Sequence, residues 1–532
     1  MGKNFSGTMK LSAFFIRRER VVFGIWLVVL LVLAWAVALV FENQMTFEEL
    51  QALLILRTNP AQVALQGPIY SVGGVLQPGP MFAAEMHLFT MVAIAIMNIF
   101  MINRLTRSDE EKGRYEVIRS LPIGRIAGLN AAIITAFLAN SVVAFGHGLL
   151  LGAIGITGID FAGAFAYGVS LGVIGYFFGV LTALFAQLFP SSRGTTGYAF
   201  GFLIIAFMIR AVGDPTSEAL AMASPFGLLM RAQVFVGNYW WPVLIIIGLS
   251  LGICVLAYVL DSRRDMDQGY IPQRQGPAEA SPSMLSPLGF TWRLARSAFT
   301  AWAVGMLALG AALGSLMGEA ESFAADNEIF VAMMPASPDF TITQLFVMLL
   351  NVLLAIVCIA PVISLCLKQY SEERGHRAEY VLGTAVSRTK YMLSYVAVGF
   401  GASLVMPFAT AFGLWLVGAF TMAEPIAFGT MLWAIMVYVP ALWVILGLCF
   451  FIIGVAPKLI AICWGYFGYA FIVGFFGDLL SLPSWAMRIS PIGFVPMVPL
   501  DEVRVLTMMG LVAAAVVLTA LGIFFYRERD LV

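Results

Sequence analysis

The sequence predicts an all-α polytopic membrane protein with about twelve transmembrane helices, arranged as two six-helix parallel repeats. The chain of 532 residues is 61% hydrophobic and its mean hydropathy is +0.92, whereas soluble globular proteins are about 45–50% apolar. Many windows exceed the roughly 18–20 apolar residues that cross a bilayer. The weak alternation typical of a membrane β-barrel is absent from the sequence. Long apolar helices are therefore the predicted building elements.

Twelve apolar stretches are predicted to span the membrane, each followed by a polar or charged segment. The basic residues before the first stretch resemble the start of a signal peptide, but no A-x-A-like cleavage site follows, so we expect an uncleaved first helix. The predicted spans are 21–41, 84–103, 126–152, 162–188, 195–213, 238–261, 298–318, 340–366, 391–418, 427–454, 459–478 and 505–526.

The distribution of basic residues predicts the orientation of these spans. With the N-terminus in the cytoplasm, 25 of the 30 Lys and Arg residues lie in segments on the cytoplasmic side. Because segments rich in Lys and Arg stay in the cytoplasm, both termini are predicted to be cytoplasmic. The formal net charge of zero disfavours a nucleic-acid partner.

A polar segment divides the spans into two sets of six. Residues 262–297 begin with a stretch rich in Pro, Gly, Ser and Gln, which is typical of a flexible linker. We expect this linker to be cytoplasmic. It separates a first transmembrane half, 21–261, from a second half, 298–532.

Short motifs recur in the same order in the two halves, which indicates an internal duplication. Because each half has six spans, both insert with the same orientation, as in parallel transporter repeats, and the transport pathway is expected between them. An Arg-Asp pair also follows the last span of each half, at Arg264-Asp265 and Arg529-Asp530. The recurring motifs are Ser108-Asp109-Glu110 and Ser371-Glu372-Glu373, Arg17-x-x-Arg20-x5-Trp26 and Arg293-x-x-Arg296-x5-Trp302, and Ser224-Pro225-x-Gly227 and Ser490-Pro491-x-Gly493.

The most charged of these segments, RSDEEKGRYEVIRSLPIGR at 107–125, lies between the second and third spans. Its pattern predicts a short amphipathic helix along the membrane surface, ended by Pro122 and Gly124. It is either a loop that sets the topology or a docking surface for a soluble partner. The first interpretation explains the arginines but not the acidic residues, which contribute little to orientation. Docking explains both, because opposite charges give register and specificity.

The sequence contains no phosphate-binding loop of the form G-x-x-x-x-G-K-[ST]. Transport driven by ATP therefore requires an ATPase on a separate polypeptide, and the alternative energy source is an ion gradient. Gradient-driven carriers usually keep ionisable groups within the membrane. The candidates here are few, namely Glu85, His87 and His147, and no mid-membrane carboxylate is evident, which disfavours a gradient-driven carrier.

Enzyme and metal chemistry are also disfavoured. The three histidines form no H-E-x-x-H motif, and no carboxylate cluster suits a metal ion. The five cysteines lie in apolar stretches without a C-x-x-C pair, so we interpret them as small core side chains. Gly168-x3-Gly172 and Gly175-x3-Gly179 are typical of closely packed helices. No catalytic, cofactor-binding or metal-binding residue is predicted.

The quoted motifs resemble those of permeases of ABC-type drug exporters. The resemblance is to the "exporter of polyketide antibiotics" group, which is related to tetronasin-resistance permeases. It rests on EEKGRYEVIRSLPIGR after the second span, the R-R-x-R sequence before the first span, and the SPFG and SPIG turns before the last span of each half. Gly375 lies one position before the place that corresponds to Gly113, so the second half matches the motif less well.

The resemblance implies an ABC type-2 exporter fold. In such proteins a short coupling helix between the second and third spans of each half docks on a dimeric ATPase, and a cytoplasmic amphipathic helix, here within 1–20, precedes the first span. The coupling segments would be Asp109–Arg125 and Glu372–Arg388. The residues expected to bind the ATPase are Asp109, Glu110, Arg114, Glu116, Arg125, Glu372, Glu373, Arg377, Glu379 and Arg388.

The expected function is that of the membrane subunit of an ATP-driven ABC exporter for hydrophobic or amphiphilic compounds such as antibiotics. The expected partners are two copies of an ATPase, which would bind ATP and Mg, the small substrate, and the lipid of a bacterial cell membrane. This chain is expected to bind no cofactor. The sequence does not identify substrate-binding residues. A gradient-driven transporter and a membrane protein that binds a compound for immunity or sensing remain as alternatives.

Overall fold

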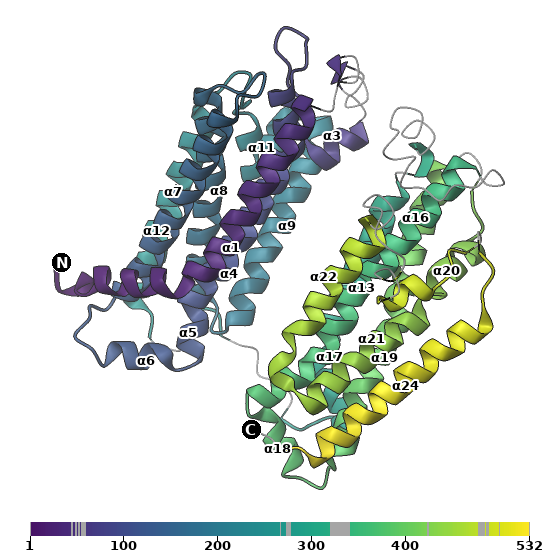
Figure 1. Ribbon diagram of the computed structural model, residues 1–532. Coiled ribbons are helices and arrows are strands. Elements are labelled where there is room, and N and C mark those ends of the chain that lie inside the picture. The colour runs from purple at the N-terminus through teal and green to yellow at the C-terminus, as the bar shows by residue number, and fades with distance from the viewer. Residues whose placement is uncertain are drawn as a thin grey trace. The chain divides into compact units, whose positions relative to one another are not determined.

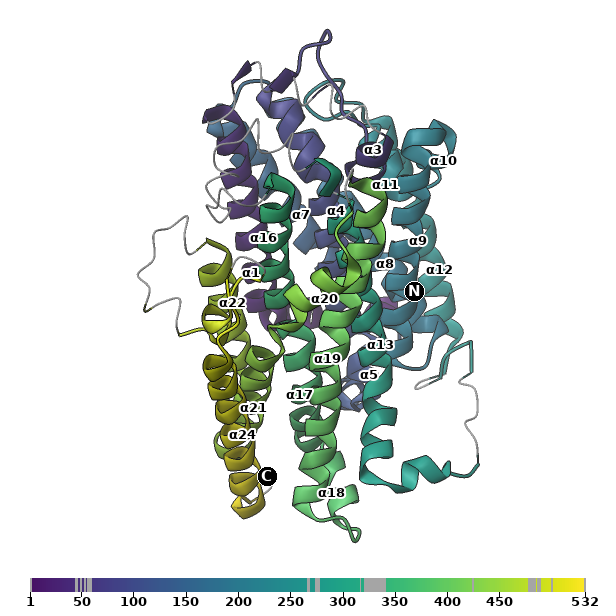
Figure 2. The same cartoon turned by 90° about the vertical axis from the view of Figure 1, so that its right-hand side faces the viewer.

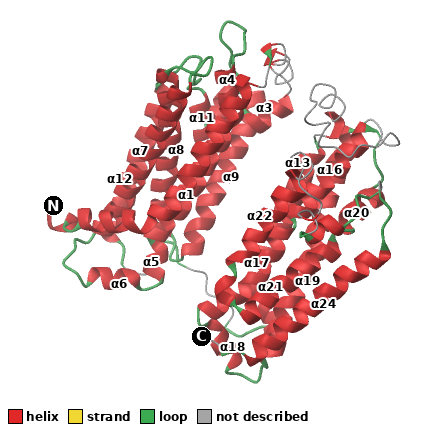
Figure 3. Cartoon of the chain, in the orientation of Figure 1, coloured by secondary structure: helices red, strands yellow, loops and turns green. Residues whose placement is uncertain are grey.

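The computed structural model describes residues 2–43, 46–47, 50–51, 54, 60–265, 268–272, 278–315, 317–319, 341–422, 425–476, 485, 489–498 and 501–530 (Figure 1). Within these residues the ordered elements are helices, apart from one isolated β-bridge between Val72 and Val75 (Figure 3). Eleven helices in the described ranges are long and apolar enough to cross a membrane. The predicted all-α polytopic membrane class is therefore confirmed.

The chain forms two compact units, unit 1 at Met1–Gly276 and unit 2 at Pro277–Val532. The division falls inside 262–297, the segment that the sequence predicts to be a linker. Each unit is described by itself below. In each, the end that carries the segment between the second and third spans is called the inner end, because the sequence predicts it to be cytoplasmic, and the opposite end is called the outer end.

Unit 1 contains six long helices whose positions match the six spans predicted for the first half. Short helices connect them at both ends of the bundle. The long helices are α1 (Thr8–Asn43), α4 (Pro78–Leu105), α7 (Ala127–Ile154), α8 (Phe161–Leu188), α9 (Ser192–Thr216) and α12 (Trp241–Arg263). The short ones are η1 (Gly2–Phe5), α3 (Pro60–Gln66), α5 (Arg107–Glu111), α6 (Arg114–Arg119), α10 (Glu218–Met222) and α11 (Pro225–Met230).

Helix α8 lies at the centre of unit 1 and packs closely against α7. A Cβ atom on Gly172 would lie 2.7 Å from the Asn140 carbonyl oxygen, and one on Gly168 would overlap the carbonyl of Ala144. These glycines therefore let the two backbones meet, as the small-residue spacing predicts. Gly175 faces Asn98 and Asn140, whose side-chain amides are hydrogen-bonded to each other in both directions at 3.0 and 2.7 Å.

The first helix of unit 1 has two parts with different directions. Its first residues run across the inner end of the bundle, and the remainder rises along the bundle toward the outer end (Figure 1). Leu11, Phe15 and Glu19 are buried on one face of the first part, whereas Lys10 and Arg17 are exposed. This part has the two-faced character of a helix that lies at a membrane surface.

Unit 2 contains the helices of the second half, drawn from teal through green to yellow in Figure 2. Two of the predicted spans are each built from consecutive helices, α16 with α17 and α20 with α21. The helices are α13 (Pro287–Gly314), α16 (Ile342–Val357), α17 (Ile359–Arg374), α18 (Arg377–Leu382), α19 (Arg388–Thr421), α20 (Phe428–Met436), α21 (Val439–Val455), α22 (Ala461–Phe476) and α24 (Val505–Glu528), with 3-10 turns η2 (Pro282–Leu285), η3 (Met317–Glu319), η4 (Pro457–Leu459) and η5 (Pro491–Phe494).

Two boundaries in unit 2 differ from the predicted spans. Helix α13 begins at Pro287, inside the predicted linker, because Ser286 caps it by accepting a hydrogen bond from the Gly289 amide and proline suits the first turn. Helix α22 has sixteen residues and ends at Phe476, where the described residues stop. It lies within the predicted span 459–478 but is not among the eleven helices of spanning length.

Glycines also bring helices together in unit 2. A Cβ atom on Gly314 of α13 would lie 2.5 Å from the Leu414 carbonyl oxygen of α19, and one on Gly454 of α21 would overlap the backbone of Gly522 in α24. Such glycines were predicted only in the first half. The spacing of four between Gly310 and Gly314 is the signal that identifies this contact from sequence.

Candidate functional site

The candidate site of unit 1 is the segment between α4 and α7, residues 106–126. It folds as two short helices, α5 and α6, and not as the single amphipathic helix that the sequence predicts. Gly113 separates them with a φ of +69°, which glycine adopts without the steric cost that a Cβ atom adds. Helix α6 ends at Arg119, before Pro122, as predicted.

The two acidic residues of α5 point into unit 1. Asp109 is 2% exposed and pairs with Arg18 at 2.6 Å and with Arg114 at 3.4 Å. Glu110 is 8% exposed and accepts two parallel hydrogen bonds from Arg264, at 2.9 and 3.0 Å. It also pairs with Arg107 at 3.0 Å. Both carboxylates are therefore engaged within the unit, and the prediction that they bind a partner stays untested.

The predicted contact residues of α6 lie on the surface. Arg114 and Glu116 are exposed, and Val117 and Leu121 beside them are 71% and 59% exposed. Arg125, also exposed, donates a hydrogen bond to the Arg264 carbonyl at 3.1 Å. The structure thus places the predicted site residues of unit 1 in two groups, an inward pair on α5 and an outward group around α6.

The corresponding segment of unit 2 repeats this division. Glu372 is buried and bound by Arg377 at 2.5 Å and by Lys368 at 3.3 Å, and buried Glu373 pairs with Arg529. Glu379 is exposed and contacts His376 at 2.8 Å. Tyr380, Arg377 and Glu379 form the outward group, and Tyr380 is 81% exposed.

The backbone turn is also repeated, although its glycine is not. His376 has a φ of +55° and lies 263 residues after Gly113, at the corresponding position. Histidine is one of the non-glycine residues that enter this region more often than most. The displaced Gly375, which weakens the sequence match, therefore does not change the turn that precedes α18.

The ion pairs of the inner end include residues that sequence reasoning did not find. Arg18 of α1 pairs with Asp109, and Arg104 of α4 pairs with Glu19 of α1 at 2.6 Å, so the first part of α1 is bound to the segment between α4 and α7. Unit 2 has Leu294 and Ala295 at the places of Arg18 and Glu19 in the repeat. Because the internal repeat does not extend to these residues, it could not predict the ion pairs of Arg18 and Glu19.

Two electrostatic shifts bear on this surface. The hydrogen bond with Glu372 raises the pKa of Arg377, so this exposed guanidinium stays charged near neutral pH. Burial raises the pKa of the Tyr115 hydroxyl, which therefore stays neutral.

A polar pocket with about 460 Å³ of empty space lies between α6 and the bundle of unit 1. Gln187 lines it, and its Oε1 atom is buried without a hydrogen-bond partner in the described part of the chain. A pocket of this polarity can hold ordered water beneath α6. Its other lining residues are Leu105, Thr106, Glu110, Tyr115, Arg119, Gly128, Leu129, Ala186, Asp261 and Arg264.

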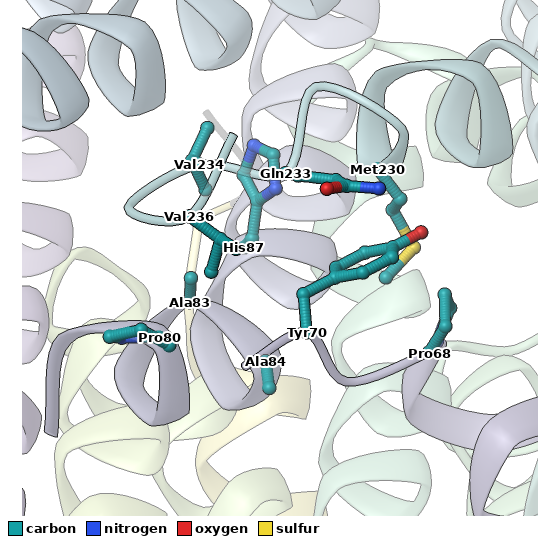
Figure 4. Close-up of a pocket in the computed structure, with 10 residues that line it drawn as sticks. All are labelled: Pro68, Tyr70, Pro80, Ala83, Ala84, His87, Met230, Gln233, Val234 and Val236. Atoms are coloured by element: carbon teal, nitrogen blue, oxygen red, sulfur yellow. The ribbon is translucent and has the colours of Figure 1, made fainter. Parts of the chain in front are cut away.

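A second pocket, with about 310 Å³ of empty space, lies at the outer end of unit 1 (Figure 4). His87 lines it but is buried and hydrogen-bonded to the Ser170 hydroxyl at 2.6 Å, so it is a satisfied core residue, as is the usual case. The remaining lining residues are Pro68, Tyr70, Pro80, Ala83, Ala84, Met230, Gln233, Val234 and Val236.

Other candidate ligands do not form a metal or redox centre within the residues that the structure describes. No group of three or more His, Cys, Asp or Glu side chains there could hold a metal ion. The five cysteines are free and buried, and His147 contacts the Val143 carbonyl at 2.9 Å. Glu85 and the histidines do not gather into one cluster there.

Comparisons with known proteins agree with a transporter. Residues 284–527 match the family described as "Multidrug efflux system permease Rv1217c, C-terminal domain". Over 543 aligned residues the chain is 31% identical to the multidrug efflux system permease protein Rv1217c of Mycobacterium tuberculosis. The alignment covers 99% of this chain and 96% of that relative.

Proposed function

The chain belongs to the family of multidrug efflux system permeases, and we propose that it is the membrane subunit of an ATP-driven exporter whose ATPase is a separate polypeptide. Two copies of the ATPase would bind one chain and supply the sites for ATP and Mg. The substrates would be hydrophobic or amphiphilic compounds such as antibiotics, as in the polyketide-antibiotic exporters that the motifs resemble. Under this proposal both termini lie in the cytoplasm of a bacterial cell.

The observation that carries the proposal is a repeated outward group at the inner end of each unit. Arg114-x-Glu116-Val117 and Arg377-x-Glu379-Tyr380 both follow a residue with positive φ. All of their side chains named here are exposed. We call these two groups docking surface 1 and docking surface 2.

The chemistry of these surfaces fits a protein partner. An exposed apolar side chain flanked by opposite charges offers a hydrophobic contact together with electrostatic register. A lipid surface would not require the order of one cation and one anion before the apolar residue to be repeated in both units. The absence of a phosphate-binding loop from the sequence leaves the energy source to such a partner.

The proposal is tested by purifying the tagged chain in mild detergent, after crosslinking in the membrane, and identifying the proteins that accompany it. The test variant is Glu116→Lys/Glu379→Lys, which reverses one exposed charge on each docking surface. The matched control is Glu528→Lys, another exposed glutamate at the inner end. We expect an ATPase with the wild type and the control, and its loss from the test variant at equal membrane insertion.

Other results would redirect the assignment. If all three chains retain an ATPase, the assignment as an exporter stands, but the docking site does not depend on Glu116 and Glu379. The consistent absence of an ATPase from the crosslinked wild type would contradict the proposal. It would favour a gradient-driven carrier, or a membrane protein that binds compounds without moving them.

A further inference from the structure

The same three-residue arrangement joins three parts of the chain at the inner end of each unit. In unit 1, Glu110 binds the side chain of Arg264, while Arg125 donates to the carbonyl of Arg264 at 3.1 Å. In unit 2, Glu373 binds the side chain of Arg529, while Arg388 donates to the carbonyl of that residue at 2.6 Å. We call these arrangements clasp 1 (Glu110, Arg125, Arg264) and clasp 2 (Glu373, Arg388, Arg529).

Each clasp connects the same places in the two units. The glutamate lies in the segment that leads to the docking surface, and the first arginine begins the third span or immediately precedes it. The second arginine is the first residue after the sixth span, α12 in unit 1 and α24 in unit 2. A clasp therefore holds the end of the sixth span against the base of the docking surface.

The ion pair between the glutamate and the second arginine of each clasp is largely buried. The side chains of Glu110 and Arg264 are 8% and 10% exposed, and those of Glu373 and Arg529 are 9% and 17% exposed. Hydrogen bonds between charged groups are short and strong, and the paired geometry at Glu110 fixes orientation as well as distance. In clasp 2, removing Arg529 would leave the buried carboxylate of Glu373 without its ion-pair partner, which is unfavourable.

We infer that Arg264 and Arg529 are positioning residues that transmit displacement of the docking surfaces to the sixth span of each unit. The inference rests on the proposed function, because it requires an ATPase that moves the docking surfaces. Displacement of α5 would move Arg264 through its ion pair with Glu110, and displacement of the end of α17 would move Arg529 through Glu373. Each arginine directly follows the sixth span of its unit, so that helix would move with it.

The sixth span can pass the movement on within its own unit. In unit 2, α24 lies along α21, and Gly522 and Gly454 bring the two backbones into direct contact. In unit 1, α12 packs on α8, the central helix. The sixth span of each unit therefore connects the inner end to the fourth span.

The test measures a movement of α24 in the assembled complex. Spin labels are placed at Leu506→Cys and Phe420→Cys, two exposed positions near the outer ends of α24 and α19 in unit 2. Their distance is measured in the wild-type complex with its ATPase, before and after trapping with ATP and vanadate. We expect a shift of about 2 Å or more, the size of helix shifts in switching proteins.

The test variant Arg529→Gln breaks clasp 2, and the control Arg527→Gln removes an exposed arginine from the same turn. We expect Arg529→Gln to keep the ATPase bound but to lose at least half of the distance shift, and Arg527→Gln to retain it. If Arg529→Gln does not assemble, Glu373→Met/Arg529→Met removes both buried charges, a change that proteins tolerate better, and should lose the shift in the same way.

Three results would overturn the inference. The first is an unchanged distance shift in assembled complexes that lack clasp 2. The second is the absence of any shift in the assembled wild type, which would leave the exporter intact but remove α24 as the moving helix. The third is the absence of an ATPase from the wild type, which is the failure of the proposed function itself and is recognised at the purification step.

Discussion

The Tyr115 hydroxyl lies where a Cβ atom on Gly128 would be, so that the ring rests directly on the start of α7. The corresponding positions in unit 2 carry the opposite sizes. Ala378 is the small residue on α18, Tyr391 is the large residue on α19, and both are buried in one hydrophobic cluster. The tyrosine of this pair of positions is therefore supplied by α6 in unit 1 and by α19 in unit 2.

Gly128→Ala should displace α6. The added methyl group overlaps the Tyr115 ring, and overpacking of this kind typically costs about 1–3 kcal/mol. We expect a lower thermal unfolding midpoint of the purified chain and weaker retention of the ATPase. The double variant Tyr115→Ala/Gly128→Ala removes the overlap, so Gly128→Ala should cost nothing further in the Tyr115→Ala background. An equal cost in both backgrounds would show that the ring is not the obstacle.

Substitution of Gly113 should be costly, whereas substitution of His376 by glycine should not. An L-residue in the left-handed region costs about 1–2 kcal/mol, so Gly113→Ala should destabilise the turn before α6 by about that amount. His376 already bears this cost, and His376→Gly removes it while losing the contact with Glu379. Thermal unfolding midpoints of the two variants check the contrast. Equal losses would mean that the positive φ does not decide the effect.

The predicted spans agree with the structure because hydropathy over twenty residues is a property of the local sequence. All twelve predicted ranges coincide at least in part with helices in the described residues. Local breaks were not predicted. Cys358 separates α16 from α17 inside one apolar stretch, and Gly113 divides the coupling segment into two helices. A single residue of this kind does not change the mean hydropathy of a window of about twenty residues, so the break is not visible in it.

The candidate site was predicted as a segment but not as an arrangement. The repeat identified 107–125 and 371–388, yet nothing within them tells whether a carboxylate faces outward or into the bundle. That depends on Arg264 and Arg529, which lie 154 and 156 residues away from Glu110 and Glu373. The Arg-Asp pairs after the last spans recur at nearly the same offset as the acidic pairs. This shared offset was the sequence signal that could have predicted the pairing of Glu110 with Arg264 and of Glu373 with Arg529.

Asp214 should be essential to the outer end of unit 1. It pairs with Arg210 at 3.1 Å and with Arg231 at 3.3 Å, and the side chains of Asp214 and Arg210 are fully buried. Because Asp214→Asn removes the carboxylate that pairs with the buried Arg210 guanidinium, we expect a loss of about 3–5 kcal/mol in stability. The control Glu218→Gln alters the 68% exposed partner of Arg231 and should change the unfolding midpoint little. Similar midpoints for the two variants would contradict this account.

Gly175→Ala should separate α8 from α4 and α7. A Cβ atom there would overlap the Asn140 side chain and lie 2.7 Å from the Asn98 amide nitrogen, and so would disturb the hydrogen-bonded amide pair. We expect a lower unfolding midpoint. Gly197 of α9 has open space around its Cβ position, so Gly197→Ala should leave the midpoint unchanged or raise it, since alanine favours the helix. Destabilisation by both variants would point to a general intolerance of helix substitution.

The two docking surfaces should contribute unequally to retention of the ATPase. Tyr380 offers a larger apolar surface than Val117, and aromatic side chains dominate many interfaces. Tyr380→Asp should therefore weaken retention more than Val117→Asp, by about tenfold or more for an aromatic residue at an interface centre.

Retention is measured as the molar ratio of ATPase to permease after crosslinking-free purification at increasing dilution. If two ATPase copies bind, each single variant should keep the copy on its intact surface, so that the molar ratio of ATPase to permease falls toward one. The double variant Val117→Asp/Tyr380→Asp should lose both copies. The exposed control Leu285→Asp, in the turn η2 before α13, should keep the wild-type ratio. A complete loss of both copies in either single variant would mean that they bind as a preformed dimer that needs both docking surfaces at once.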